Sequence, residues 1–194
     1  MAPLLAFLEV VASPAMSELV LRTERFDLRV LQPSDFDDLF RFYGDPEAMR
    51  YVGSDGRAID EHAARRAIDR HIEHQRANGF SLWGIVDRVD GRVIGCAGLY
   101  LVEGTGPDVE LVYELVRDRW GEGIATETAR ACLEYGLNEL GLGTVIGLAY
   151  PENGPSVRVM EKLGMRREPD VIAYGRRMAK FSAGAAEPAA PGMD

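Results

Sequence analysis

The sequence predicts an α+β fold in which a mixed, mostly antiparallel central sheet carries helices on both faces. Three strand-type segments follow one another at residues 80–86, 92–101 and 109–116, and Asp90-Gly91 between the first two is a typical hairpin turn. A glycine-rich turn then opens a long helical pattern. The short apolar run at residues 144–149, bounded by glycine, is typical of a buried strand. Consecutive hairpins followed by a strand–helix–strand passage indicate a mixed sheet.

The first part of the chain adds a strand and three helices. Residues 26–31 alternate apolar and polar side chains, as a half-buried strand does. Pro33-Ser34-Asp35 supplies helix-start residues, and apolar side chains follow at helical spacing as far as Tyr43. Gly44-Asp45-Pro46 ends that helix and opens a short one through Met49. A longer amphipathic helix covers residues 59–75.

The remaining elements follow from the same two periods. Asn78-Gly79 ends the amphipathic helix, and a second turn precedes the third strand. The helix after the glycine-rich turn is long, the last helix ends at Gly164, and two strands close the chain. The predicted bounds are 104–107 for the turn, 125–139 and 156–163 for the helices, and 165–167 and 174–181 for the strands.

Length and composition favour one domain with loosely attached ends. The chain has 194 residues and a mass of 21.4 kDa, 46% of them hydrophobic. We expect an N-terminal extension at 1–18, with Met16 as an alternative start, a single domain at 19–181, and a disordered tail at 182–194. The apolar run at 4–12 lacks a basic leader and is too short to span a bilayer, so we expect no signal or membrane segment.

The net charge and the cysteine and histidine content limit the classes of ligand, metal and cellular compartment that we expect. The formal net charge of −9 argues against a nucleic-acid or anionic-membrane partner and is a weak bias towards cationic substrates such as amines. Cys96 and Cys132 lie in apolar patterns and are expected to be reduced core thiols of a cytoplasmic protein. His71 and His74 have no Cys, Asp or Glu to complete a metal set, so we expect no metal.

The glycine-rich turn is the first candidate site. Residues 119–126 read RWGEGIAT and stand between a strand and the start of a helix. Gly121 and Gly123 allow a tight turn and a close approach of the backbone to a ligand. The first N–H groups of the helix lack internal partners and lie at the positive end of its dipole, so the turn predicts an anion site. The alternative is an ordinary connection that needs glycine for its geometry. A dinucleotide-binding fold is disfavoured, because it requires a parallel βαβ unit and here antiparallel strands precede the turn.

Two motifs together resemble the GNAT N-acetyltransferase superfamily, in particular the branch with the ribosomal-protein-alanine N-acetyltransferases. The first motif, LVRDRWGEGIATE at residues 115–127, has Gly123 and Ala125 where the family pattern has glycine and glycine or alanine. Trp120 takes the place of the family's Gln or Arg, a substitution that looks usual for this branch. The second motif runs from Asn153-Gly154-Pro155-Ser156 to Gly164-Met165. The resemblance covers about residues 20–181 and implies a GNAT-like fold with acetyl-CoA as co-substrate.

The resemblance also implies which residues bind acetyl-CoA. The turn would bind the pyrophosphate through its backbone N–H groups, and free backbone groups on Leu115 and Val116 would bind the pantetheine amides. Arg117 stands where the family often has proline, a mild departure. The implied acetyl-CoA residues are Leu115, Val116, Trp120, Gly121, Glu122, Gly123, Ile124, Ala125, Thr126 and Asn153.

Glu110 is the candidate general base. Acetyl transfer needs a neutral amine, and a carboxylate in an otherwise apolar strand is costly unless it has a task or a partner. Burial would raise the pKa of Glu110 towards a value useful for a base, acting directly or through water. The alternative is an exposed residue or half of an ion pair. Glu114 shares the same strand face and is the second candidate, unless a bulge breaks the alternation.

Other site residues follow from the resemblance. Ser156 would donate a proton or a hydrogen bond to the leaving thiolate, or it would simply cap the following helix. The backbone N–H of Leu115 would stabilise the oxyanion. The substrate cleft would be walled by the loop at 51–56 and two further segments, with Tyr51, Trp83 and Tyr174 as the candidate contacts. Asp55, Asp60 and Asp170 remain unranked candidates for a cationic substrate.

The sequence therefore predicts an acetyl-CoA-dependent N-acetyltransferase that acts by direct transfer in a ternary complex. The acceptor is a primary amine, either a protein N-terminus or a small amine. The alternative is a non-catalytic acyl-CoA sensor or interaction module of the same fold. Cys96 and Cys132 lie in core patterns, so a covalent enzyme intermediate is not expected. The resemblance is compatible with a homodimer, for which the residues themselves give no evidence.

Overall fold

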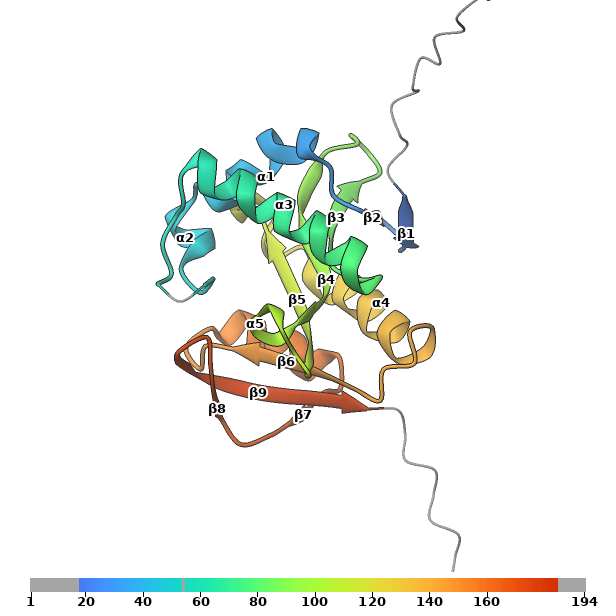
Figure 1. Ribbon diagram of the computed structural model, residues 1–194, viewed down its shortest axis with the longest axis vertical. Helices are drawn as coiled ribbons and strands as arrows, with labels where there is room; N and C mark the ends of the chain where they lie inside the picture. The colour runs from blue at the N-terminus through green and yellow to red at the C-terminus, as the bar shows by residue number, and fades with distance from the viewer. Residues whose placement is uncertain (1–17, 54, 185–194) are drawn as a thin grey trace, which may run out of the picture.

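The computed structural model describes residues 18–53 and 55–184, and these form one mixed sheet covered by helices on both faces (Figure 1). Within this part of the chain the strand order is β1-β2-β3-β4-β5-β6-β9-β7. Strand β8 pairs with the first residues of β9, from Arg176 to Met178. Adjacent strands are antiparallel except β5 and β6, which are parallel. The predicted fold class is confirmed.

The strands are β1 Leu19–Arg22, β2 Phe26–Arg29, β3 Leu82–Asp87, β4 Val93–Leu101, β5 Val109–Leu115, β6 Thr144–Ala149, β7 Arg166–Arg167, β8 Val171–Ala173 and β9 Arg176–Gly184. The α-helices are α1 Phe36–Tyr43, α2 Pro46–Met49, α3 Glu61–Asn78, α4 Ile124–Asn138 and α5 Gly154–Lys162. Short 3₁₀ helices stand at η1 Pro33–Asp35, η2 Val102–Gly104 and η3 Arg117–Arg119.

Helix ends follow the local chemistry of the sequence. The Asp45 side chain accepts hydrogen bonds from the Glu47 and Ala48 N–H groups at the start of α2, and Pro46 occupies the first helical position. Gly79 ends α3 in the left-handed conformation, with φ of 78°. These boundaries confirm the predicted ones to within a few residues.

Two features of the chain ends differ from the prediction. Strand β1 was not predicted, because four residues that are half exposed leave a weak alternating pattern. The predicted disordered tail begins at residue 182, but β9 continues to Gly184 and Ser182 pairs with Ile146 of β6 and Arg166 of β7. The pairing on both sides explains the extra length of the strand. Residues 1–17 and 185–194 lie outside the described part of the chain.

The sheet changes character between β5 and β6. Strands β4 and β5 pair over seven consecutive positions, whereas β5 and β6 pair only at Glu110↔Ile146. In Figure 1, β5 runs away from β6 towards α1 and α2. Helix α4 covers β4 and β5 on one face at close range, because a Cβ at Gly136 would stand 2.8 Å from Leu99 Cδ1. The sheet therefore opens beyond Glu110 on its β6 side.

Candidate functional site

The turn before α4 leaves its backbone accessible. Gly121 and Gly123 have φ values of 83° and 78°, and Gly123 is the N-cap of α4 without a side-chain hydrogen bond. Among the described residues, no atom comes within 4 Å of a Cβ built at Gly121. A Cβ at Gly123 meets only an Arg25 nitrogen, at 3.8 Å. The N–H groups at the start of α4 are therefore not covered by neighbouring side chains, which is the geometry that the predicted anion site requires.

Ion pairs and hydrogen bonds join this turn to the connection between β1 and β2. Arg25 donates to the Glu122 carbonyl oxygen at 3.1 Å and to Glu127 Oε2 at 2.7 Å. Glu127 also accepts from the Thr23 hydroxyl at 2.6 Å, which lowers the pKa of its carboxyl group despite partial burial. Arg119 pairs with the Glu122 side chain at 3.1 Å, so the carboxylates of Glu122 and Glu127 each have an arginine partner. The sequence did not predict these contacts between the β1–β2 connection and the turn and first residues of α4.

The open edge of β5 is defined by the backbone register. The Val116 N–H donates to the Ile94 carbonyl oxygen at 3.0 Å, so the even-numbered residues before it exchange hydrogen bonds with β4. The backbone groups of Tyr113 and Leu115 consequently point the other way, beyond the last β6 pair.

Two backbone groups predicted to be free have partners. The Val116 N–H is bonded to β4, and the Leu115 carbonyl oxygen accepts from the indole N–H of Trp120 at 3.0 Å. Trp120 is 50% exposed and packs along the end of β5 in this way. The prediction for these two groups is wrong, because the strand register and the Trp120 side chain satisfy them. The Leu115 N–H keeps its place on the open edge.

Glu110 is a buried carboxylate at the point where the sheet opens. Its side chain is 7% exposed, and it accepts a hydrogen bond from the Tyr174 hydroxyl. Burial raises the pKa of Glu110 to about 7, and the Tyr174 hydrogen bond opposes this rise. The structure thus brings two predicted site residues together from β5 and from the turn between β8 and β9.

Tyr174 is held in place by Glu103, from the connection between β4 and β5. Its N–H donates to Glu103 Oε1 at 2.8 Å, and its hydroxyl oxygen accepts from the Glu103 N–H at 3.2 Å. Among the described residues, Glu103 and Tyr174 are the non-glycine residues with positive φ, 55° and 53°. Such backbone conformations cost free energy and persist where surrounding contacts hold them. The two loops therefore fix one another above Glu110.

Glu114 lies on the same face of β5 as Glu110. The β4–β5 register contains no bulge, so the alternation predicted for the two carboxylates holds. Burial and the nearby Glu110 charge raise the pKa of Glu114 to about 7. Within the described residues, Glu114 Oε2 and His71 Nδ1 are the buried side-chain atoms without a hydrogen-bond partner. Desolvation lowers the pKa of His71 to about 4, which keeps its imidazole neutral.

Ser156 contacts the face of β5 opposite Glu110 and Glu114, and it does not cap α5. Asn153 is the N-cap residue, and its side-chain oxygen accepts from the Ser156 N–H at 3.3 Å. The Ser156 hydroxyl contacts the Tyr113 hydroxyl at 2.9 Å. The alternative in which Ser156 caps the helix is therefore wrong. Sequence reasoning missed Tyr113, although its odd number on β5 placed it on the face opposite Glu110.

The three aromatic residues predicted for the substrate cleft have different surroundings. Trp83 is 0% exposed, its indole donates to Gln75 Oε1 at 2.9 Å, and it packs against Tyr135. We correct that prediction, because Trp83 is a core residue without access to a cleft. Tyr51 is half-buried and packs against Tyr150 in a tilted arrangement, with ring centroids 5.8 Å apart.

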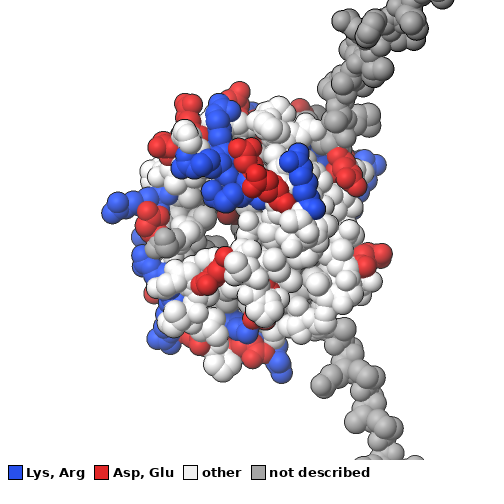
Figure 2. Space-filling view, viewed as in Figure 1, with Lys and Arg blue, Asp and Glu red and all other residues white. Residues whose placement is uncertain are grey.

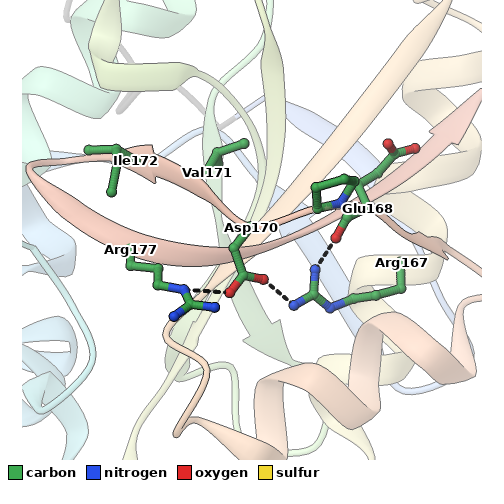
Figure 3. Close-up of a pocket in the computed structure, with 7 residues that line it drawn as sticks. Arg167, Glu168, Asp170, Val171, Ile172 and Arg177 are labelled. Carbon is green, nitrogen blue, oxygen red and sulfur yellow. Dashed lines mark hydrogen bonds and ion pairs between the residues drawn. The ribbon is translucent and has the colours of Figure 1, made fainter.

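The aspartates considered for a cationic substrate are partly committed to other roles. Asp170 accepts from Arg177 at 2.7 Å and from Arg167, beside a cavity of about 690 Å³ lined by these residues and β8 (Figure 3). These two arginines lower the pKa of Asp170. Asp60 caps α3 by accepting from the Ala63 N–H at 2.7 Å. Asp55 is exposed.

The surface around the opening carries both signs of charge. Figure 2 shows acidic and basic side chains in small mixed groups over its upper part, and a hollow at the left between the upper and lower halves of the molecule. Among residues 18–53 and 55–184, no helix is both long and apolar enough to cross a bilayer. The same residues contain no group of three or more His, Cys, Asp or Glu side chains suited to a metal ion.

Comparison with known proteins identifies the architecture. Residues 25–166 match the family model described as an acetyltransferase (GNAT) domain. The chain is 34% identical over 152 residues to the Bacillus licheniformis protein named uncharacterized N-acetyltransferase p20, covering 76% of this chain and 83% of that one.

Solved structures give the same answer for the fold. The acetyltransferase from Agrobacterium tumefaciens superposes with a TM-score of 0.74 at 25% identity, covering 88% of this chain and 96% of that one. The ribosomal L7/L12 α-N-protein acetyltransferase RimL, solved in complex with coenzyme A, has a TM-score of 0.72 at 12% identity, covering 86% of this chain and 98% of RimL.

Proposed function

This chain belongs to the GNAT acetyltransferase family, and from that premise we propose that it transfers the acetyl group of acetyl-CoA to a primary amine by direct attack in a ternary complex. One observation carries the proposal. The buried Glu110 carboxylate stands at the single position where β5 pairs with β6, and the open turn before α4 lies beyond the far end of the same strand. A donor bound along β5 would then meet an acceptor amine at Glu110.

The acetyl-CoA diphosphate fits the turn from Gly121 to Thr126. Several uncovered N–H groups at the positive end of a helix dipole suit two phosphates, and Gly121 presents no side chain in the way. The pantetheine amides fit the outward-facing backbone groups of Tyr113 and Leu115, as an added strand would. In this arrangement Asn153 holds the loop before α5 through its capping hydrogen bond.

Glu110 acts as the general base. A primary alkylamine such as the lysine side chain has a pKa of about 10.4 and is mostly protonated at neutral pH. A carboxylate whose pKa is about 7 accepts the amine proton far better than an ordinary glutamate. Tyr174 keeps this carboxylate oriented and partly offsets the cost of its burial.

The acetyl carbonyl oxygen and the leaving thiolate of coenzyme A each need a hydrogen-bond donor. The Leu115 N–H on the open edge of β5 donates to the oxyanion that develops on the acetyl carbonyl. The Ser156 hydroxyl donates to the departing thiolate. Cys96 and Cys132 are fully buried, and burial raises the pKa of each thiol, so neither provides a nucleophile for a covalent route.

The acceptor is either a small amine or a peptide N-terminus. The buried carboxylate of Glu110 and the net charge of −9 favour a positively charged acceptor. The protein is proposed to act in the cytoplasm, where its two free cysteines stay reduced.

A thiol-release assay tests the proposal. The purified chain is incubated with acetyl-CoA and a panel of small amines and peptides with free N-termini, and free thiol is measured against amine-free controls. Amine-dependent release supports the transferase. Thermal stabilisation by acetyl-CoA without thiol release from any amine would favour the acyl-CoA sensor instead. At a hundred times its dissociation constant, the ligand should add about 2.7 kcal/mol to the free energy of unfolding.

A further inference from the structure

We propose that Tyr113 is a further positioning residue of the transfer, which acts by directing the Ser156 hydroxyl towards the departing thiolate. The proposal rests on the proposed function. It is carried by the contact between the two hydroxyl groups, 2.9 Å apart, which joins β5 to the first turn of α5.

The contact stands at the opening of the sheet. Tyr113 follows Glu110 by three residues, beyond the only β5–β6 register pair, and its side chain projects to the face of the sheet opposite Glu110. Both Tyr113 and Ser156 are half-buried, so the pair adjoins the opening without being sealed in the core. The Asn153 cap fixes the backbone of Ser156 on the same side.

The hydrogen bonds of the pair permit two states. The Tyr113 hydroxyl lies 3.0 Å from the Ser156 carbonyl oxygen and 2.9 Å from Ser156 Oγ. If Tyr113 donates to the carbonyl oxygen, the serine proton points back to the phenol oxygen. If Tyr113 donates to Oγ, the serine proton is directed outward and can be donated to an anion in the opening. Developing negative charge on sulfur selects the second state, because charge-assisted hydrogen bonds are the stronger ones.

Tyr113 keeps its proton throughout. Burial raises the pKa of Tyr113 to about 12, well above the value of about 8.5 for an ordinary thiol. In the transfer the C–N bond forms, the C–S bond breaks, sulfur takes the electron pair, and the amine proton passes to Glu110. Tyr113 and Ser156 stabilise the thiolate by hydrogen bonding, and no proton leaves either residue.

The test compares Y113F with S156A in the full-length protein. Both variants should lower kcat about tenfold at little change in the acetyl-CoA KM, and the double variant should be no worse than either single one. Y135F is the matched control, because it removes a tyrosine hydroxyl from α4, where the half-buried Tyr135 packs against the core residue Trp83. Its kcat should be unchanged.

A spectroscopic readout separates positioning from structure. The thiolate absorbance of coenzyme A bound to the protein is titrated with pH; the wild-type protein should lower the thiol pKa below that of free coenzyme A, and both Y113F and S156A should raise it again by roughly one unit. A Y113F protein with wild-type kcat and wild-type thiol pKa would overturn the proposal. A Y113F protein with a lowered kcat, in which the thiol of bound coenzyme A keeps the pKa that it has in the wild-type complex, would overturn it as well. Failure of the wild-type protein to release thiol with any amine would instead reject the proposed function.

Discussion

The Tyr174 hydroxyl donates its hydrogen bond to the carboxylate of Glu110, and so joins the turn between β8 and β9 to the start of β5. The two residues are 64 positions apart in the chain, and Glu103 from the β4–β5 connection holds Tyr174 in place. The relationship matters because Glu110 is buried and, in the proposed mechanism, must be an anion. A hydrogen bond to the charged form favours that form, so Tyr174 limits the rise in pKa that burial causes.

Replacing Glu110 by glutamine should remove the base and leave the fold intact. We expect E110Q to lower kcat by about 10² to 10⁴ at neutral pH, with an unchanged dissociation constant for acetyl-CoA. Steady-state kinetics and calorimetry measure the two quantities. E114Q is the matched control on the same strand face and should lose much less activity. If E114Q loses the activity and E110Q keeps it, the roles of the two carboxylates are reversed.

The pH profile should report Glu110 directly. Since the base must be ionised, kcat/KM should rise with pH through an apparent pKa of about 7. Y174F removes the hydrogen bond to the ionised carboxylate, so the pKa of Glu110 should increase and the acidic limb should move to higher pH. An acidic limb that stays in place in Y174F, or moves to lower pH, would contradict this role for Tyr174.

Glu114 should make the protein less stable at alkaline pH. Its pKa is about 7 in the folded protein against about 4.5 when unfolded, so the folded state binds the proton more tightly. Stability is therefore greatest below pH 4.5 on this account and falls as pH rises to 7, by on the order of 2–3 kcal/mol at most because the side chain is only partly covered. E114Q should thus melt higher than wild type at pH 8, with little difference at pH 4. Equal melting differences at both pH values would argue against a half-buried, unpartnered carboxylate whose charge destabilises the folded state.

The glycine-rich turn can be tested with a matched pair of alanine variants. Gly121 and Gly141 both have positive φ, 83° and 65°, and in both a new Cβ meets no described atom within 4 Å. G121A and G141A should therefore each cost about 1–2 kcal/mol of stability. G121A alone should raise the acetyl-CoA KM several-fold, because it changes the backbone at the diphosphate. Equal KM values for the two variants would place the diphosphate elsewhere.

The sequence predicted those features of the candidate site that depend on local chemistry. Glu110 stood out because a carboxylate in an apolar strand is conspicuous, and Gly121 and Gly123 because only glycine readily adopts their φ values. The cap at Asp45-Pro46 and the end of α3 at Gly79 are local in the same sense. Each of these signals lies within a few residues of the feature it predicts.

What the sequence did not predict depends on contacts between distant segments. The Tyr113–Ser156 pair joins residues 43 positions apart, and nothing near either residue announces the other. Trp83 was assigned to the cleft because an aromatic residue fits a pocket and a core equally well. The Val116 N–H was expected to be free, and only the register of β4 against β5 shows that it is bonded.

The most direct measurement follows the acetyl group itself. The protein is incubated with isotopically labelled acetyl-CoA and an acceptor identified by the thiol-release panel, and mass spectrometry follows both the amine and the protein. The account predicts one labelled acetyl amide on the amine for each thiol released, an unlabelled protein at all times, and a rate that falls steeply in E110Q. Label on the protein before it reaches the amine, or thiol release that continues at the same rate without an amine, would contradict it.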